Sequence, residues 1–142
     1  TYLHGHDWRF DITFGADKLD ECGFVVDVGE LGVVKNFLRD TFDHTLLLNA
    51  DDPYLDHFQK MLAGRGTPPG YEGQGVETIS DFANIVVVPS CGMEGLANFV
   101  YNAVDGIIRD HFYDDCKKRN LHVVKVVCWE DSKNRAEYPY NL

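Results

Sequence analysis

The segment LHGHDWRFDITF, residues 3–14, alternates regularly between two kinds of side chain. Imidazole, aromatic and aliphatic groups occupy every second position: His4, His6, Trp8, Phe10, Ile12 and Phe14. Small or polar groups occupy the positions between them: Gly5, Asp7, Arg9, Asp11 and Thr13. Because successive side chains leave a β-strand on opposite sides, this period of two predicts a strand over residues 3–14.

The first half of the chain then mixes strands and helices. A short apolar run after a polar turn predicts a second strand over residues 23–28. Apolar residues at helical spacing predict an amphipathic helix from Glu30 to about Thr41. Two acidic residues before Pro53 favour a further helix that runs to Ala63.

A glycine-rich segment separates that helix from the next apolar run. Residues 64–76, GRGTPPGYEGQGV, contain five glycines and two prolines and predict a surface loop. A phosphate-binding glycine loop needs a lysine and a helix directly after the glycines, and this segment has neither. Residues 84–88 are apolar enough to form a short buried strand.

The second half of the chain determines the fold class. Gly92 begins a long predicted helix that ends near Lys118. A strand with apolar residues on both faces follows over residues 121–130, and residues 135–140 are suited to pair with it as a hairpin. Grouped strands beside two main helices are typical of an α+β fold with an antiparallel sheet. A length of 142 residues fits one domain.

Composition excludes several classes of protein. Thirteen basic and 23 acidic residues give a net charge of −10, which argues against nucleic acid or an anionic membrane as a partner. No apolar run approaches the roughly 18 to 20 residues of a membrane span, and no signal peptide begins the chain. The four cysteines are scattered, as in proteins of the reducing cytoplasm: Cys22, Cys91, Cys116 and Cys128.

The pair His4 and His6 is a candidate metal site. Histidines two positions apart on a strand point to the same side, and the small Gly5 between them allows close approach to the backbone. Two imidazoles on one face provide half of a zinc site, which also needs a third protein ligand. The alternative is an exposed strand end that carries two histidines by chance.

Two further positions carry candidate chemistry. Asp43 precedes His44, and an aspartate beside an imidazole can fix its tautomer and hold it ready as a base. The alternative for this pair is a helix C-terminal cap. Glu130 ends a strand after Val124, Val126 and Cys128 on one face. Its carboxylate is either an acceptor for paired N–H donors of a ligand or a residue at the wet rim of the sheet.

Four motifs follow one another in order: LHGH at residues 3–6, GFVVDVGEL at 23–31, FDH at 42–44 with LN at 48–49, and WE at 129–130. Together they resemble the 6-pyruvoyl tetrahydropterin synthase family, which includes bacterial 6-carboxy-tetrahydropterin synthases. The resemblance covers nearly the whole chain except about residues 50–90.

This resemblance implies a tunnelling fold, in which an antiparallel four-stranded sheet carries two helices on one face. Such subunits form a homo-oligomer, a hexamer or tetramer, whose sheets join into a barrel with active sites between subunits. The implied activity is that of a cytoplasmic lyase that converts 7,8-dihydroneopterin triphosphate with loss of triphosphate. The product would be 6-carboxy-tetrahydropterin, for deazapurine (queuosine) biosynthesis, or 6-pyruvoyl tetrahydropterin, for biopterin biosynthesis. We favour the first.

The resemblance also implies a role for each candidate residue. His4 and His6 match two of three zinc ligands, and Asp43 and His44 match part of a Cys-Asp-His proton relay. Glu130 matches the glutamate that anchors the pterin ring. The third histidine and the relay cysteine precede LHGH in the family, so we expect them on an N-terminal strand upstream of Thr1.

Besides the missing upstream strand, two features depart from the family pattern. Residues 89–94, PSCGME, match the proline-threonine-x-glutamate entry of the second helix only loosely. Residues 50–90 form an insertion within the single predicted domain, 1–142. A triphosphate also requires local basic charge in this acidic chain, and Arg9, Lys125 and Arg135 lie on suitable elements.

Two other functions fit the same residues. The first is a non-catalytic tunnelling-fold protein that binds a pterin or purine, or that only assembles. The second is an aldolase-like activity on dihydroneopterin itself. A cysteine and a histidine upstream of Thr1 would favour the synthase, and their absence would favour the binding protein.

Overall fold

A computed structural model of the chain describes residues 3–63 and 84–140. The chain divides into two compact units, which are considered separately. The first unit contains Thr1–Asp40 and Gly92–Leu142, and the second contains Thr41–Cys91. The prediction of one domain with an insertion at about 50–90 stays a prediction.

The first unit is built on an antiparallel sheet of three strands, in agreement with the predicted α+β class. Its strands are β1 (Arg9–Gly15), β4 (His122–Trp129) and β5 (Arg135–Tyr138). They lie in the order β1-β4-β5, so β4 pairs with both other strands. Residues 135–138 thus pair with β4 as the predicted hairpin.

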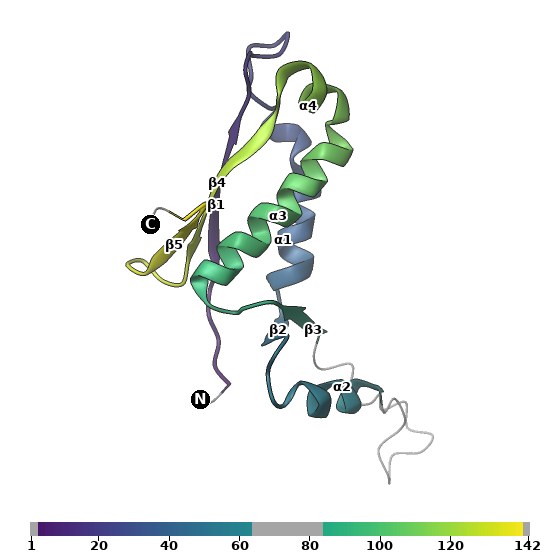
Figure 1. Cartoon of the computed structure of the whole chain (residues 1–142), viewed down its shortest axis with the longest axis vertical. Coiled ribbons are helices and arrows are strands. Elements are labelled where there is room, and N and C mark those ends of the chain that lie inside the picture. Colours follow the sequence, from purple (N-terminus) through teal and green to yellow (C-terminus); the bar gives the residue numbers. More distant parts are fainter. Residues whose placement is uncertain (1–2, 64–83, 141–142) are drawn as a thin grey trace. The chain divides into compact units, whose positions relative to one another are not determined.

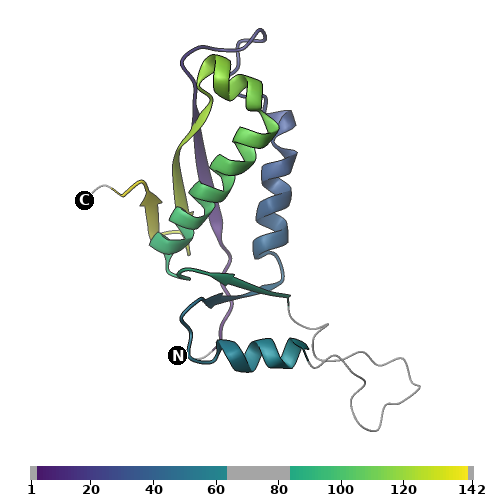
Figure 2. The same cartoon turned by 45° about the vertical axis from the view of Figure 1, so that its right-hand side comes forward.

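One long helix covers this sheet and makes the core of the first unit. Helix α3 (Met93–His111) buries one apolar stripe: Leu96, Ala97, Val100, Val104 and Ile108. This stripe packs against β4, whose Val123, Val126 and Cys128 are at most 1% exposed. Helix α1 (Gly32–Phe42) runs beside α3 in Figures 1 and 2. The ring centroids of Phe37 in α1 and Phe99 in α3 lie 6.1 Å apart. The helix predicted from Glu30 to Thr41 is therefore confirmed.

The strand predicted over residues 23–28 is wrong, because side chains satisfy the backbone of this segment locally. The Asp20 carboxylate accepts hydrogen bonds from the backbone N–H groups of Cys22 and Phe24. The Asp27 carboxylate accepts one from Gly29 and caps the short helix η1 (Val28–Glu30). Such contacts offer the backbone an alternative to a sheet ladder.

Two boundaries and one strand face differ from the sequence prediction. Strand β1 begins at Arg9 rather than at residue 3, since Arg9 pairs with Trp129, the last residue of β4. The predicted long helix is interrupted at Phe112, after which α4 (Tyr113–Arg119) begins in a new direction. The register of β1 and β4 shifts after Thr13, so Val124 is 42% exposed and does not share the buried face of Val126 and Cys128.

The second unit contains a parallel pair of strands, which the sequence analysis did not foresee. Strand β2 (Thr45–Asn49) pairs in parallel with β3 (Asn84–Val88), and helix α2 (Leu55–Ala63) lies between them in the sequence. The strand predicted at 84–88 and the helix predicted to end at Ala63 are confirmed. The loop predicted at 64–76 lies outside the described residues.

Within the two described stretches, none of the helices combines the length and apolar character needed to cross a lipid bilayer.

Candidate active site

The two histidines of the first motif lie close to the glutamate that follows β4. The ring centroids of His4 and His6 are 4.6 Å apart in an edge-to-face arrangement. The Nε2 atom of His6 lies 3.1 Å from Oε1 of Glu130, and these side chains are 28% and 32% exposed. Residues from the start and the end of the chain thus form one imidazole–carboxylate cluster in the first unit.

The sheet and its hairpin turn hold Glu130 in this position. The backbone N–H of Glu130 donates to the carbonyl of Asn134 at 3.1 Å, which closes the turn between β4 and β5. Inside the turn, the Asp131 carboxylate accepts hydrogen bonds from the backbone N–H groups of Asn134 and Lys133. These two bonds lower the pKa of Asp131, so the turn is held by an ionised carboxylate at neutral pH.

His4 and His6 fit zinc as a pair of donors. Neutral imidazole is a preferred zinc ligand, and two adjacent rings provide two of the three protein ligands of a catalytic site. The Glu130 carboxylate favours a proton on Nε2 of His6, which leaves Nδ1 of that ring as the electron-pair donor. In residues 3–63 and 84–140, no group of three or more histidine, cysteine or acidic residues could hold a metal ion. Within the described residues, the pair thus lacks the third protein ligand that zinc needs.

A second glutamate lies near the same end of the sheet. Burial, with smaller contributions from the carboxylates of Glu130 and Glu94, raises the pKa of the Cys128 thiol to about 12. Glu94 lies in the first turn of α3, where the Tyr140 hydroxyl donates to its backbone carbonyl at 3.1 Å. Glu94 was not among the residues predicted for the site. The pattern that could have indicated it is the loose match of residues 89–94 to the family's helix entry.

The candidate relay residues lie in the second unit. Asp43 and His44 form the turn between α1 and β2, and Nδ1 of His44 lies 3.0 Å from Oδ1 of Asp43. The His44 backbone has a φ of 54°, in the left-handed region, and its side chain is 93% exposed. Because Asp43 takes Nδ1, the opposite nitrogen of the ring faces solvent and is free to exchange protons.

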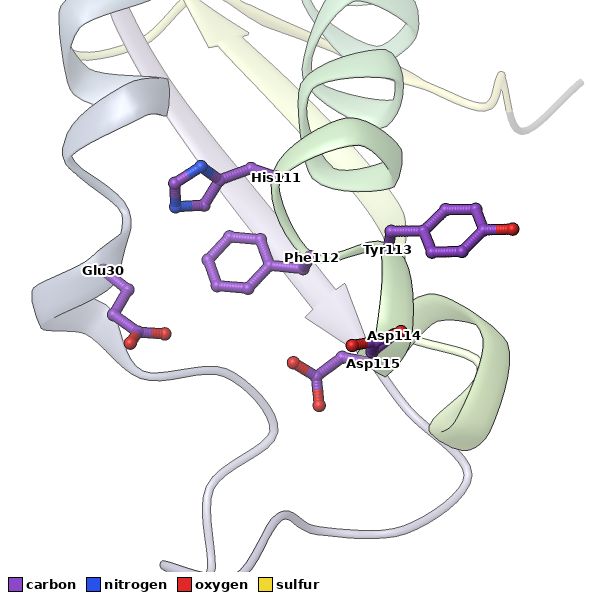
Figure 3. Close-up of a pocket in the computed structure, with 6 residues that line it drawn as sticks. All are labelled: Glu30, His111, Phe112, Tyr113, Asp114 and Asp115. Carbon is purple, nitrogen blue, oxygen red and sulfur yellow. The ribbon is translucent and has the colours of Figure 1, made fainter.

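A hollow of about 410 Å³ in the first unit contains none of the predicted site residues. Figure 3 shows its lining from η1 and from the junction of α3 with α4: Glu30, His111, Phe112, Tyr113, Asp114 and Asp115. Asp115 is already paired with Arg119 at 2.8 Å. Because its lining shares no residue with the imidazole–carboxylate cluster, the hollow is a separate feature of the first unit.

Comparison with known proteins identifies the family. The family model described as 6-pyruvoyl tetrahydropterin synthase matches residues 1–141. The chain belongs to the 6-pyruvoyl tetrahydropterin synthase family. The resemblance inferred from the four motifs is thereby confirmed.

Curated relatives of this tetrahydropterin synthase family carry a more specific name. The chain is 28% identical to a 6-carboxy-5,6,7,8-tetrahydropterin synthase of Aquifex aeolicus over 96% of its own length and 73% of that protein's length. It is 40% identical over 52 residues to the protein of the same name from Rickettsia felis, covering 36% of this chain and 38% of that one.

Solved structures agree with the fold of this family. An uncharacterized protein from Wolinella succinogenes superposes with a TM-score of 0.70 at 22% identity, covering 99% of this chain and 80% of that one. The 6-pyruvoyl tetrahydropterin synthase of Plasmodium vivax gives a TM-score of 0.59 at 15% identity, covering 96% and 80%. At these identities the likeness concerns the fold alone.

Proposed function

We propose that this protein is a zinc-dependent pterin synthase that converts 7,8-dihydroneopterin triphosphate with loss of triphosphate. The observation that carries the proposal is the cluster of His4, His6 and Glu130 in a chain of the tetrahydropterin synthase family. Two imidazole donors stand next to a carboxylate that can accept hydrogen bonds from a ring. The proposed metal ligands and the proposed ring anchor thus lie close together.

His4 and His6 would hold the zinc ion, together with a third histidine from outside the described residues. Zinc, when bound, supplies a Lewis acid that polarises the side-chain hydroxyl and carbonyl oxygens of the substrate. In this arrangement Glu130 orients the His6 ring through Nε2, as carboxylates commonly do for zinc-binding histidines.

Glu130 would also anchor the pterin. A carboxylate offers about four lone-pair sites over two oxygens, and the bond to His6 uses only Oε1. The remaining oxygen can accept a hydrogen bond from the amino group or the adjacent ring N–H of a pterin. The same side chain can therefore orient a metal ligand and fix the position of the substrate.

Asp43 and His44 would move protons between carbon and oxygen positions of the substrate. The Asp43 carboxylate stabilises the imidazolium that forms when His44 takes up a proton, and it fixes which nitrogen does so. A cysteine from outside the described residues would complete the relay. Triphosphate leaves by elimination, so this route requires no nucleotide or redox cofactor.

The relatives favour one of the two products. Curated proteins at 28% and 40% identity are named 6-carboxy-5,6,7,8-tetrahydropterin synthase, which supports formation of 6-carboxy-tetrahydropterin. That product belongs to deazapurine (queuosine) biosynthesis in the cytoplasm. A homo-oligomer, hexamer or tetramer, whose sheets join into a barrel is part of the same proposal.

Metal content tests the zinc role. Elemental analysis of the protein with its native N-terminus should find about one zinc per subunit, and His6→Ala should lose it. His57→Ala, which removes an exposed histidine from α2, is the matched control and should retain the metal. Metal-free wild-type protein that still binds a pterin would instead support the non-catalytic alternative.

Pterin binding tests the anchor separately. Glu130→Ala should weaken binding of a pterin by at least about tenfold, since a charge-assisted hydrogen bond contributes about 1.5–3 kcal/mol. Glu137→Ala, on β5, is the control for loss of one carboxylate. Unchanged pterin affinity in Glu130→Ala would reject the anchoring role, whatever the metal content.

A further inference from the structure

A row of three side chains crosses the sheet of the first unit. Arg9 of β1 lies directly opposite Trp129 of β4, and Trp129 lies directly opposite Arg135 of β5. Residues directly opposite each other project from the same face of a sheet. The neighbouring Cys128 is buried under α3, so this arginine–tryptophan row lies on the other face, away from the helix.

Both guanidinium groups contact the same indole ring. The Cζ atom of Arg9 lies 4.3 Å from the ring centroid of Trp129, and that of Arg135 lies 5.1 Å from it. A guanidinium over an aromatic face is attracted by the ring's quadrupole. A guanidinium that stacks on an aromatic ring keeps its N–H groups available in its own plane, where they can bind an anion.

The position of the indole is itself fixed. Nε1 of Trp129 donates to Oδ2 of Asp11 at 2.8 Å, and Nη2 of Arg9 lies 3.3 Å from the same oxygen. One carboxylate thus holds the ring and one of the two arginines. This reduces the conformational freedom that a ligand would otherwise have to remove on binding.

The row carries an excess of positive charge in an acidic chain. Asp11 neutralises one of the two arginines, whereas no carboxylate of the described residues 3–63 and 84–140 lies within ion-pair distance of Arg135. Lys125, on the same face, is 3.8 Å from Glu137 and therefore already compensated. The chain has a net charge of −10, so two guanidinium groups at one aromatic ring form a local concentration of positive charge on an acidic protein.

We infer that the arginine–tryptophan row binds an oligophosphate group. Each guanidinium offers several N–H donors, and a phosphate group can accept two hydrogen bonds from one guanidinium. An oligophosphate has enough oxygens to engage both arginines, whereas a single carboxylate can satisfy only one of them well. The group belongs either to the substrate's own triphosphate tail or to a separate phosphorylated metabolite.

Calorimetric titration of the full chain with inorganic tripolyphosphate at low ionic strength tests the site. The titration is done with and without a chelator, because the anion also binds metal ions. Saturable binding that persists with the chelator is expected, and Arg9→Ala and Arg135→Ala should each weaken it about tenfold. Absence of saturable binding in the wild-type protein would overturn the inference.

Two control variants sharpen the result. Arg109→Ala removes the same charge from an exposed ion pair on α3 and should leave the affinity unchanged. Asp11→Asn keeps an acceptor for the indole N–H but removes the neutralising charge, so it should tighten binding several-fold. Equal losses in Arg109→Ala and Arg135→Ala, or weaker binding in Asp11→Asn, would show a nonspecific charge effect and contradict the site.

Turnover of the pterin substrate distinguishes the two sources of phosphate. If the row holds the substrate's tail, tripolyphosphate competes with substrate, and Arg135→Ala raises KM and abolishes that competition. If it serves a separate ligand, tripolyphosphate binds without competing. The first source rests on the proposed function, whereas the site itself does not. Tripolyphosphate binding in a protein without pterin turnover would therefore refute the proposed function and leave the oligophosphate site standing.

Discussion

Each unit contains an imidazole–carboxylate pair. The nitrogen–oxygen distances of the two pairs are nearly equal, but the residues that form them are differently spaced in the sequence. His6 and Glu130 lie 3.1 Å apart in the first unit, and His44 and Asp43 lie 3.0 Å apart in the second. The first pair joins opposite ends of the chain and is about one-third exposed, whereas the second joins sequence neighbours in an exposed turn. The first therefore depends on the folded sheet, and the second depends mainly on its own turn.

The same contrast between a contact that depends on the fold and an exposed local one applies to two arginines of the first unit. The largest effect is expected when the buried one, Arg119, is removed. Arg119 is 6% exposed and donates to the carbonyls of Lys18 and Val25 as well as to the Asp115 carboxylate. Arg119→Ala would leave these acceptors without their donor. We expect a loss of about 2–4 kcal/mol in the free energy of unfolding, measured by urea denaturation.

Arg109→Ala is the matched control for that prediction. Arg109 also pairs with an aspartate four residues earlier, Asp105 at 2.9 Å, but it is 70% exposed. Its removal should cost no more than about 0.5 kcal/mol, because exposed ion pairs contribute little. Similar costs for the two arginine variants would show that the burial of Arg119 does not stabilise the first unit.

The next effect concerns alkaline pH. Burial raises the pKa of Cys128 from its ordinary value of 9.0 to about 12, so the folded protein keeps a proton that the unfolded chain releases. The stabilisation is complete below pH 9 and is lost as the pH rises toward 12. Cys128→Ala should therefore show a shallower fall in melting temperature between pH 8 and about 11 than the wild type.

Cys91 of the second unit provides the comparison for this slope. Burial also raises its pKa, with a further contribution from Asp52, but the residue is only half-buried. Cys91→Ala should thus change the alkaline slope in the same direction and by less than Cys128→Ala. A larger change for Cys91→Ala than for Cys128→Ala would contradict the expectation that the more deeply buried thiol contributes more to the alkaline loss of stability.

A smaller effect is expected at a hydrogen bond inside the second unit. The Asn49 side chain, at the end of β2, accepts a bond from the backbone N–H of Cys91 at 2.6 Å. Asn49→Ala should cost about 1 kcal/mol in unfolding free energy, the usual contribution of such a bond. Asn102→Ala on α3, which removes exposed bonds to Asn98, is the control and should be nearly neutral. Equal values would contradict a structural role for Asn49.

The smallest stability change is expected at the exposed pair itself. His44 has a φ of 54°, a conformation that costs a side-chain-bearing residue about 1 kcal/mol and costs glycine little. His44→Gly should leave the unfolding free energy within about 0.5 kcal/mol of the wild type, while His44→Val should lower it by about 1–2 kcal/mol. Under the proposed function, both variants should lose pterin synthase activity. Full activity in His44→Gly would remove this residue from the relay.

The sequence predicted the elements whose pattern is repeated over several turns or strand positions. The apolar stripe of α3 and the hairpin of β4 and β5 follow directly from side-chain periodicity. The turn at residues 20–29 was not predicted, because Asp20 and Asp27 compete for backbone N–H groups over two to four residues, a contact that periodicity does not register.

Two long-range features also lay beyond the sequence pattern. The parallel pairing of β2 with β3 requires residues 45–49 and 84–88 to meet, and neither segment indicates its partner. Alternation correctly suggested that His4 and His6 are neighbours, although residues 3–8 are not part of β1. The contact of His6 with Glu130 became visible only once the register of β1 and β4 was known.

The two tryptophans of the chain give the protein two built-in optical probes. The ring of Trp8 lies 5.1 Å from that of His6, so its fluorescence should respond when a metal ion is added to the histidine pair. Trp129 sits between two guanidiniums, and its emission should respond to anions instead. Trp8→Phe and Trp129→Phe would separate these signals, so both sites can be titrated in one cuvette without any attached dye.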